Sequence, residues 1–245
     1  MMRYTAHSVY RQFASFPPQV AQWRRFWQSY RDYNQMASLT MPARMPDLYP
    51  CIADATAETE IEPVYFYQDA WAFEKIVQLH PSFHIDVGSH HKFVALLSKV
   101  MPVTMVDIRP LSLPLNTLKF QQGSILDLPF KDGELPSLSS ICVVEHIGLG
   151  RYGDPLDPLG SEKALSELKR VVAPGGHLFL SVPVGEKNII SFNAGRIFSR
   201  DYLFRLFEPF ELVDQHYIVG KSFQDTYAPQ PGFGTTGLFE LRKLS

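Results

Sequence analysis

The sequence predicts an α/β protein in which helices cover both faces of a mostly parallel sheet. From residue 83 onward, short apolar runs alternate with segments of helical periodicity, which is typical of right-handed βαβ units. The first apolar run ends in Asp86-Val-Gly88, and the second, about twenty residues later, ends in Asp107. A parallel sheet can offer a nucleoside two anchors in this way. The glycine lets the ligand approach the backbone, and the acid accepts hydrogen bonds from the ribose hydroxyls.

The composition is that of an ordinary globular protein. Of the 245 residues, 45% are apolar and 20% charged, and the formal net charge is −2, so neither wholesale disorder nor a nucleic-acid partner is indicated. The two cysteines, Cys51 and Cys142, suggest no disulfide framework and no zinc site. Residues 1–16 hold no uninterrupted apolar run, and no segment approaches the length of a membrane span. We therefore expect a cytoplasmic protein with a small-molecule partner and no membrane partner.

The first part of the chain differs from the rest. We expect residues 1–64 to form a helical and irregular extension and residues 65–245 to form the main domain. Residues 19–36 are predicted to be helical, with an aromatic stripe that we interpret as packing or as the contact of a homodimer. That stripe consists of Trp23, Phe26, Trp27 and Tyr30. A proline-dotted stretch follows, and then a second predicted helix over residues 69–79, with Asp69 as its N-cap.

The main domain is expected to repeat strand and helix. Four strands are predicted at residues 83–87, 104–107, 118–121 and 138–144, with a helix at 92–100 after the first of them. The fourth strand is rich in β-branched residues, as a buried central strand would be. A helix with Ser161 as its cap is predicted over residues 161–172, and Pro174-Gly-Gly176 ends it. A strand at 177–182, a helix at 199–207 and strands near 211–218 and 237–241 complete the expected elements.

The ligand of such a sheet lies beyond the carboxyl ends of the strands, so the residues just after each strand are the candidates for binding. Asp86 and Gly88 follow the first strand, Asp107 and Ile108 the second, Ser124 and Ile125 the third, and residues 142–146 the fourth. Taken alone, Asp86 could be a helix cap and Asp107 a turn residue. Their order and separation within one βαβ unit favour ligand binding.

The order of these motifs resembles that of the class I S-adenosylmethionine (SAM)-dependent methyltransferases, over about residues 83–241. The motifs are Asp86-x-Gly88, Asp107, Leu128-Pro-Phe130, Val144-Glu-His146 and Arg170-Val-Val-Ala-Pro-Gly-Gly176. The stretch from Glu145 to Pro158, with Phe66-Tyr-Gln-Asp-Ala-Trp71 and Phe192-Asn-Ala-Gly-Arg-Ile197, is similar to an uncharacterised branch of that superfamily. Some members of the branch look associated with surface polysaccharide synthesis.

The resemblance implies a Rossmann-like, seven-stranded sheet with an antiparallel last strand, and SAM as the cofactor. Gly88 would lie against the methionine part of SAM, Asp107 would hold the ribose, and Ser124 and Ile125 would border the adenine. The expected cofactor-binding residues are Tyr67, Asp86, Gly88, His90, Asp107, Ile108, Ser124, Ile125 and Cys142.

Two departures from the family pattern stand out. Ser89, His90 and His91 occupy positions where the family has further glycines, so we expect His90 to meet the SAM carboxylate. Ser124 stands where an acid usually binds the adenine amino group, although a hydroxyl can still accept one hydrogen bond.

Methyl transfer to a hydroxyl needs an acceptor held in line and a base. His146, at the end of the fourth strand, is the candidate base, because imidazole titrates in the useful range. Glu145 is expected to orient His146 or to bind the SAM amino group. The alternative is that His146 packs over the sheet and bonds to the backbone.

The loop over residues 148–158 is too particular in composition to be a simple connector. We expect four residues in or near it to bind the acceptor, namely Arg151, Tyr152, Asn193 and Arg196, and a phosphate or carboxylate would suit Arg151. Helix capping and surface pairing are the alternative for the last two. Asp154 and Asp157 are expected to cap turns, and no metal site is predicted.

The leading hypothesis is a SAM-dependent methyltransferase that acts on a hydroxyl of a small-molecule or saccharide-like acceptor. The alternative is a non-catalytic methyltransferase-like module that binds a nucleoside ligand or a protein partner. A nicotinamide-dependent oxidoreductase fits less well, because Gly88-Ser-His-His91 is not the G-x-G-x-x-G loop that a pyrophosphate needs.

Overall fold

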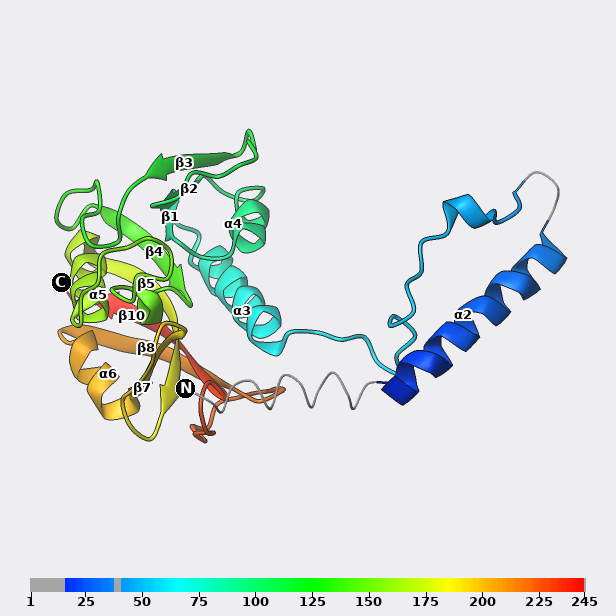
Figure 1. Ribbon diagram of the computed structural model, residues 1–245. Helices are drawn as coiled ribbons and strands as arrows, with labels where there is room; N and C mark the ends of the chain where they lie inside the picture. Colours follow the sequence, from blue (N-terminus) through cyan, green and yellow to red (C-terminus); the bar gives the residue numbers. More distant parts are fainter. Residues whose placement is uncertain (1–15, 38–40, 245) are drawn as a thin grey trace. The chain divides into compact units, whose positions relative to one another are not determined.

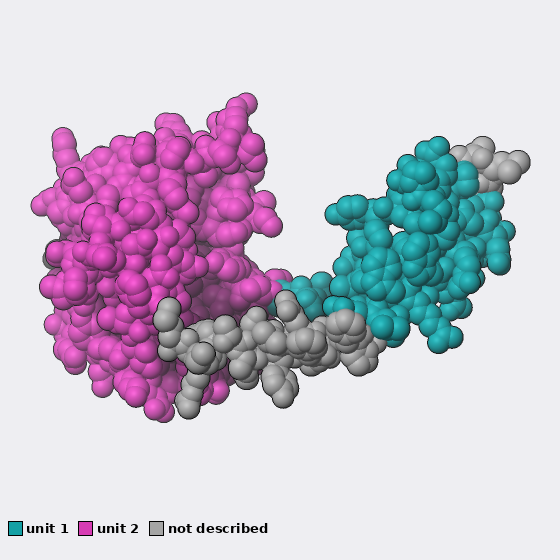
Figure 2. All heavy atoms as spheres, viewed as in Figure 1, with its two compact units in different colours: residues 1–61 teal, residues 62–245 magenta. Residues whose placement is uncertain are grey.

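The computed structural model describes residues 16–37 and 41–244. The chain divides into two compact units, residues 1–61 and 62–245 (Figure 2). In the part of the chain that the structure describes, no helix combines the length and the apolar character needed to cross a membrane.

The first unit is built on helix α2 (Phe16–Met36), which confirms the helix predicted there and begins three residues earlier. The rings of its aromatic stripe contact one another, mostly edge to face, with centroids 5.2 to 6.4 Å apart. The chain then returns along the helix through a short 3₁₀ turn, η1 (Met45–Asp47). Arg25 donates to the carbonyl of Ile52 at 3.0 Å, and Asn34 accepts the N–H of Ala43 at 3.0 Å.

The second unit contains the predicted sheet (Figure 1). Its core consists of β1 (His84–Val87), β2 (Val103–Asp107), β3 (Leu118–Gln122), β4 (Leu135–Ile141), β5 (Val172–Gly185), β8 (Phe210–Val219) and β10 (Thr235–Lys243). The order across the sheet is β3-β2-β1-β4-β5-β10-β8. Strand β10 runs antiparallel to both of its neighbours, whereas β3, β2, β1, β4 and β5 are parallel. The expected seven-stranded core with an antiparallel last strand is confirmed.

Three short strands extend this core in the described residues. Strand β9 (Ser222–Gln224) pairs with β8, and the hairpin of β6 (Ile189–Ser191) and β7 (Gly195–Ser199) pairs with the end of β5. These strands were not predicted, because each has only three to five residues, too few to show a clear periodicity.

Helices cover both faces of the sheet. Helices α5 (Gly160–Val171) and α6 (Arg200–Phe207) share a hydrophobic core with Leu178 and Leu180 of β5. Helices α3 (Pro63–Leu79) and α4 (His91–Leu97) share another core with Phe179 of the same strand. Because side chains alternate along a strand, one apolar run supplies both cores.

Two predicted helix caps are corrected. Helix α3 begins at Pro63, not at Asp69, and its cap is Glu62, whose carboxylate accepts the N–H of Tyr65 at 2.7 Å. Proline is favoured in the first helical turn, where its missing N–H costs nothing. Ser161 lies inside α5, where its hydroxyl donates to the carbonyl of Val144 at 2.6 Å.

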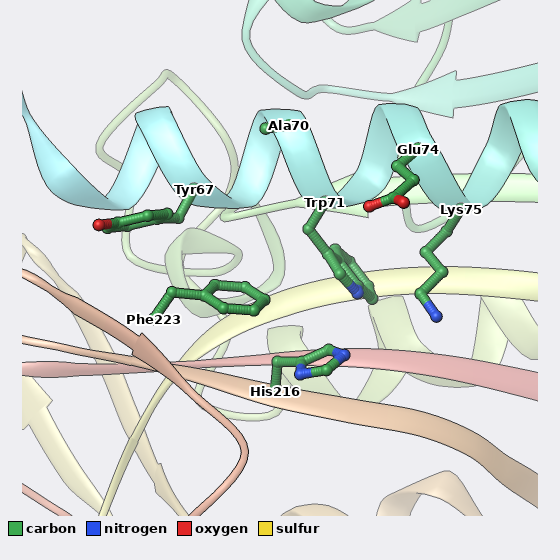
Figure 3. A pocket seen from close by; sticks show the side chains of 7 residues that line it. All are labelled: Tyr67, Ala70, Trp71, Glu74, Lys75, His216 and Phe223. Atoms are coloured by element: carbon green, nitrogen blue, oxygen red, sulfur yellow. The ribbon is translucent and has the colours of Figure 1, made fainter.

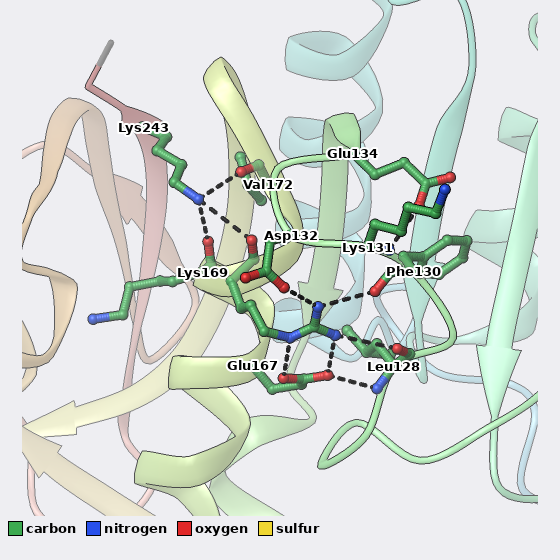
Figure 4. A network of polar contacts seen from close by, with 10 residues as sticks. Leu128, Phe130, Lys131, Asp132, Glu134, Glu167, Lys169, Val172 and Lys243 are labelled. Carbon is green, nitrogen blue, oxygen red and sulfur yellow. Dashed lines mark hydrogen bonds and ion pairs between the residues drawn. The ribbon is translucent and has the colours of Figure 1, made fainter.

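A polar network fixes the C-terminal end of α5 (Figure 4). The Arg170 guanidinium donates to Glu167 and Asp132 and to the carbonyls of Leu128 and Phe130, at 2.6 to 3.2 Å. Lys243 caps the helix, since its ammonium donates to the carbonyls of Lys169, Arg170 and Val172 at 2.8 to 3.3 Å. The network ties residues 128–132 to the domain, and this segment follows directly on the loop that carries Ser124 and Ile125.

Candidate active site

A cavity of about 1100 Å³ opens at the carboxyl ends of β1, β2, β3 and β4. This is where parallel α/β sheets bind their ligands. The expected site residues that line it are Gly88, His90, Asp107, Ile108, Ser124, Ile125, Cys142, His146 and Tyr152.

The loop after β1 is shaped by Gly88, whose φ is +73°. A Cβ at this position would lie 3.0 Å from the side chain of Val143, so only glycine fits without strain. The backbone of Gly88 is thereby exposed to the cavity.

Asp86 does not face the cavity, which corrects its assignment as a direct cofactor ligand. It is fully buried, and its carboxylate accepts the N–H and hydroxyl of Ser89 at 3.1 and 2.5 Å and the hydroxyl of Ser139 at 2.6 Å. Burial raises the pKa of Asp86 to about 6, against the lowering effect of these hydrogen bonds. Asp86 holds the loop from beneath, so its effect on a ligand would be indirect.

Asp107 is the last residue of β2, and one of its two carboxylate oxygens already accepts a hydrogen bond. Its Oδ1 accepts the backbone N–H of Arg109 at 2.8 Å, and no described residue bonds its Oδ2. Beside it lies Ile108, which is 36% exposed and gives the wall an apolar surface. The pair offers an acceptor for hydroxyl groups next to a flat apolar face.

Ser124 and Ile125 form the next part of the wall. The Ser124 hydroxyl oxygen accepts the N–H of Leu126 at 3.1 Å, and its own hydrogen remains available to donate. Ile125 is buried, at 6% exposure.

The rings of His90 and Tyr65 close one side of the cavity, with their centroids 5.2 Å apart. The buried Nδ1 of His90 has no partner among the described residues. The cofactor-binding residues expected from the sequence include Tyr67 but not Tyr65. The signal for Tyr65 is Pro63, because a proline in the first turn marks where α3 begins and thereby places Tyr65 on the helix.

Tyr67 points away from this cavity, because it lies on a different side of α3 from Tyr65. Its hydroxyl donates to the carbonyl of Lys221 at 3.4 Å, and its ring lies 5.6 Å from that of Phe223. Both rings line a second, smaller hollow of about 330 Å³, together with Trp71 and His216 (Figure 3). Tyr67 is therefore not part of the candidate site.

Cys142 follows β4 with a φ of +52°, in the left-handed region that side chains rarely adopt. Burial raises the pKa of its thiol well above the usual range, so the group stays protonated near neutral pH. The thiol donates to the Oε1 of Gln68 at 3.0 Å, and so does the hydroxyl of Ser181 at 2.9 Å. Gln68, a fully buried residue of α3, thus fixes this corner of the site.

His146 and Glu145 lie together in a 3₁₀ turn, η2 (Val144–His146). The His146 Nε2 lies 3.6 Å from the Glu145 Oε1, and its Nδ1 lies 3.5 Å from the Nη1 of Arg151. Gly195 provides room for the ring, since a Cβ there would lie 3.2 Å from the Nδ1. His146 lines the cavity, and Glu145 lies behind it at 2% exposure.

Both members of this pair are uncharged near neutral pH. Burial lowers the pKa of His146 to about 4, and the charge of Arg151 adds to the effect. Burial raises the pKa of Glu145 to about 8, and no described residue bonds its Oε2. The site therefore combines a free-base imidazole with a neutral carboxylic acid.

Substituting Glu145→Gln should make the protein more stable in weakly alkaline solution. The unfolded chain releases this proton above its ordinary pKa of 4.5, whereas the folded protein keeps it up to about pH 8. Folding stability is therefore lost as the pH rises between these values, by up to about 1.4 kcal/mol per pH unit. The free energies of unfolding of the variant and the parent, from urea denaturation at pH 5 to 8, should diverge with rising pH. Glu186→Gln, at an exposed position, is the control, and parallel curves for parent and E145Q would contradict the assignment.

The loop over residues 148–158 is held in place by its own polar groups. The Asp154 carboxylate accepts the N–H groups of Gly148, Gly150 and Tyr152 at 2.6 to 3.4 Å. Asp157 accepts from the N–H of Leu159 and from the ammonium of Lys163. Within residues 16–37 and 41–244, no group of three metal-ligating side chains occurs.

Of the four residues expected to bind the acceptor, only Tyr152 lines the cavity, and Arg151, Asn193 and Arg196 do not. Arg196 is 5% exposed and donates to the carbonyls of Ile147, Asp157 and Pro158 and to the hydroxyl of Ser161. It holds the loop from below, as a buried guanidinium with several acceptors does. Asn193 is exposed between β6 and β7 and does not line the cavity. Arg151 reaches this hairpin by donating to the carbonyl of Ala194 at 2.7 Å.

Comparison with known proteins agrees with this architecture. A family model described as a Caenorhabditis protein of unknown function, DUF268, matches residues 133–225. No curated protein sequence matches the chain.

Among solved structures, a 1,6-didemethyltoxoflavin-N1-methyltransferase from Burkholderia thailandensis, with bound 1,6-didemethyltoxoflavin and S-adenosylhomocysteine, superposes with a TM-score of 0.54. It is 15% identical, and the match covers 75% of this chain and 80% of that one. A candidate sarcosine dimethylglycine methyltransferase from Galdieria sulphuraria gives a TM-score of 0.53, at 14% identity over 73% and 86% of the two chains. The [4+2]-cyclase SpnF gives 0.51, at 13% identity over 72% and 80%. These similarities show that the chain has the class I methyltransferase fold.

Proposed function

We propose that the protein is a SAM-dependent methyltransferase that transfers a methyl group to a hydroxyl of a small-molecule or saccharide-like acceptor. One observation carries the proposal. The free Oδ2 of Asp107 and the left-handed Gly88 lie at adjacent strand ends of a single large cavity. The first suits a ribose diol, and the second suits a ligand that must approach the backbone closely.

The residues that are present fit this cofactor. Asp107 would accept hydrogen bonds from the ribose hydroxyls, while Ile108 and Ile125 would enclose the adenine between apolar surfaces. The unpartnered Nδ1 of His90 would donate to the carboxylate of the methionine part. Gly88 would provide the close backbone approach.

The acceptor would lie on the side of the cavity formed by His146 and Tyr152. Ligand cavities typically enclose about 300–1000 Å³, and this one, at about 1100 Å³, is large enough for a small acceptor to lie beside the cofactor. Bound SAM would supply a methyl group on a sulfonium centre. His146 is unprotonated above about pH 4 and would take the proton of the acceptor hydroxyl, and Glu145 would hold the ring in position. Its pKa lies below the range expected for it from the sequence, which makes it a weaker base than an ordinary imidazole.

The cofactor assignment predicts that Asp107→Ala weakens binding of SAM and S-adenosylhomocysteine by about a hundredfold, because two hydrogen bonds to one carboxylate are lost. Isothermal titration calorimetry with SAM, S-adenosylhomocysteine and NAD measures this directly. Asp127→Ala, at an exposed position close to the same cavity wall, is the matched control. Micromolar binding by the parent that survives in D107A would contradict the ribose assignment.

The second candidate is a non-catalytic module that binds a nucleoside ligand or a protein partner. It is favoured by Ser89, His90 and His91, whose side chains occupy the loop where the fold usually has glycines. The cyclase among the similar structures shows that this fold also hosts other activities. Absence of binding of SAM and S-adenosylhomocysteine by the folded parent would favour this candidate.

A further inference from the structure

Two arginines lie against the ring of Tyr152 at the cavity. The guanidinium carbon of Arg109 is 4.6 Å from the ring centroid, and that of Arg151 is 5.1 Å from it. Arg109, Tyr152 and His146 line the cavity, whereas Arg151 is not one of the lining residues and adjoins them through the Tyr152 ring. A guanidinium that stacks on an aromatic ring uses its face, and its N–H edge remains free for hydrogen bonds.

Most of these N–H groups have no partner. The Nε of Arg109 lies 3.6 Å from the Asp107 Oδ1, and no described residue bonds its Nη1 or Nη2. The Nη1 of Arg151 donates to the carbonyl of Ala194, and no described residue bonds its Nη2 or Nε. Two planar donor groups are thus held beside one ring with their hydrogen-bonding capacity largely unused.

The positive charge here is only partly balanced. The Asp154 carboxylate is turned to three backbone N–H groups of its own loop, and Glu145 carries no charge near neutral pH. Among the residues that the structure describes, Asp107 is the one carboxylate paired with Arg109, while the whole chain has a net charge of −2. The two arginines therefore form a local positive site on an acidic protein.

The site is also preorganised. Tyr152 and Arg151 belong to the loop that Asp154 fixes from within and Arg196 fixes from below. The backbone of Arg109 is bonded to Asp107. Ligand binding would therefore cost little backbone conformational entropy of the protein.

We propose that Arg109 and Arg151 bind a phosphate group on the acceptor. Phosphate is favoured over carboxylate, because it presents more oxygens and a second negative charge, and two separate guanidinium forks can then be used at once. The inference rests on the proposed function only in assigning this phosphate to the methyl acceptor; the anion site itself does not depend on SAM. The acceptor class becomes phosphorylated hydroxyl compounds, such as a sugar phosphate.

The test uses inorganic pyrophosphate as the phosphate probe and malonate as a dicarboxylate of similar length. Each is titrated into the full-length protein, with and without S-adenosylhomocysteine, while NMR follows the Nε–Hε signals of the arginines. We expect pyrophosphate to bind with a dissociation constant on the order of 1 mM and to shift the Arg109 and Arg151 signals. Malonate should bind several-fold more weakly, and added salt should weaken both.

The double variant Arg109→Gln with Arg151→Gln should weaken pyrophosphate binding by at least about tenfold. Its affinity for S-adenosylhomocysteine should stay within a few-fold of the parent value. Arg205→Gln, on the exposed side of α6, is the matched control and should bind pyrophosphate like the parent.

The outcomes separate this proposal from the function on which it rests. Equal binding of pyrophosphate by the parent and the double variant, or no binding by the parent at 10-fold the expected dissociation constant, overturns the phosphate site. Malonate binding as tight as that of pyrophosphate would also overturn the preference for phosphate. Arginine-dependent pyrophosphate binding without any binding of S-adenosylhomocysteine would support the anion site and count against the methyltransferase assignment alone.

Discussion

Gly148→Ala is expected to lower the free energy of unfolding by about 3–5 kcal/mol, as large clashes and forced backbone angles do. The φ of Gly148 is +83°, and a Cβ at this position would lie 2.1 Å from the carbonyl oxygen of Asp157. Backbone atoms cannot give way as a flexible side chain can. The N–H of Gly148 also donates to Asp154 at 2.6 Å, and its carbonyl accepts from the N–H of Asp157 at 3.0 Å. A backbone shift at residue 148 or at residue 157 would break these hydrogen bonds.

Gly153→Ala provides the matched control for this substitution. Gly153 lies in the same loop with a φ of +89°, but a Cβ there would meet no atom within 4 Å. The free energy of unfolding of G153A should fall only by the cost of placing alanine in a left-handed backbone conformation, about 1–2 kcal/mol. Urea denaturation followed by circular dichroism measures both values. Equal losses in G148A and G153A would mean that the close approach to Asp157 does not constrain the loop.

The position of the site could be predicted from the sequence because strand ends are local features. Asp107 and Gly88 directly follow apolar runs, and the topology of a parallel sheet brings such ends to one edge. The seven-stranded sheet and its antiparallel last strand were expected from the family resemblance, and the structure has both.

The side-chain directions around the site could not be predicted in the same way. Asp86 and Gly88 are two residues apart, yet one is buried beneath the loop and the other faces the cavity, as alternation along a strand requires. Tyr65 rather than Tyr67 lines the cavity, because the helix begins at Pro63, six residues before the predicted start. A shift of two residues along a helix moves a side chain to another face.

Long-range partners were also beyond the sequence pattern. Arg196 has the appearance of an acceptor ligand in the sequence, but its guanidinium meets carbonyls that are 38 to 49 residues away along the chain. Gln68 is bonded to Ser181, 113 residues away, and no local signal marks it. Such residues hold the loops that carry the site, and only the folded structure identifies their roles.

His146→Ala is expected to reduce methyl transfer by about 10²–10⁴-fold, the usual contribution of a positioned general base. Affinity for S-adenosylhomocysteine should remain within a few-fold, because the ring lies on the acceptor side, beside Tyr152 at a centroid distance of 5.6 Å. The rate is measured with a phosphorylated hydroxyl acceptor obtained by screening. Added imidazole should restore part of the activity of H146A, which a purely structural role of the ring would not allow.

The pH profile provides an independent check on this role. An ordinary histidine base loses activity as the pH falls through about 6.5. Burial and Arg151 lower the pKa of His146 to about 4, so the ring stays unprotonated and the rate should be flat between pH 5.5 and 7.5 on the acid side of the profile. An inflection near 6.5 that disappears in H146A would show that the pKa of His146 is not lowered in the working enzyme. Full activity of H146A without imidazole would instead remove His146 from the chemistry and leave it as a residue that packs against Gly195.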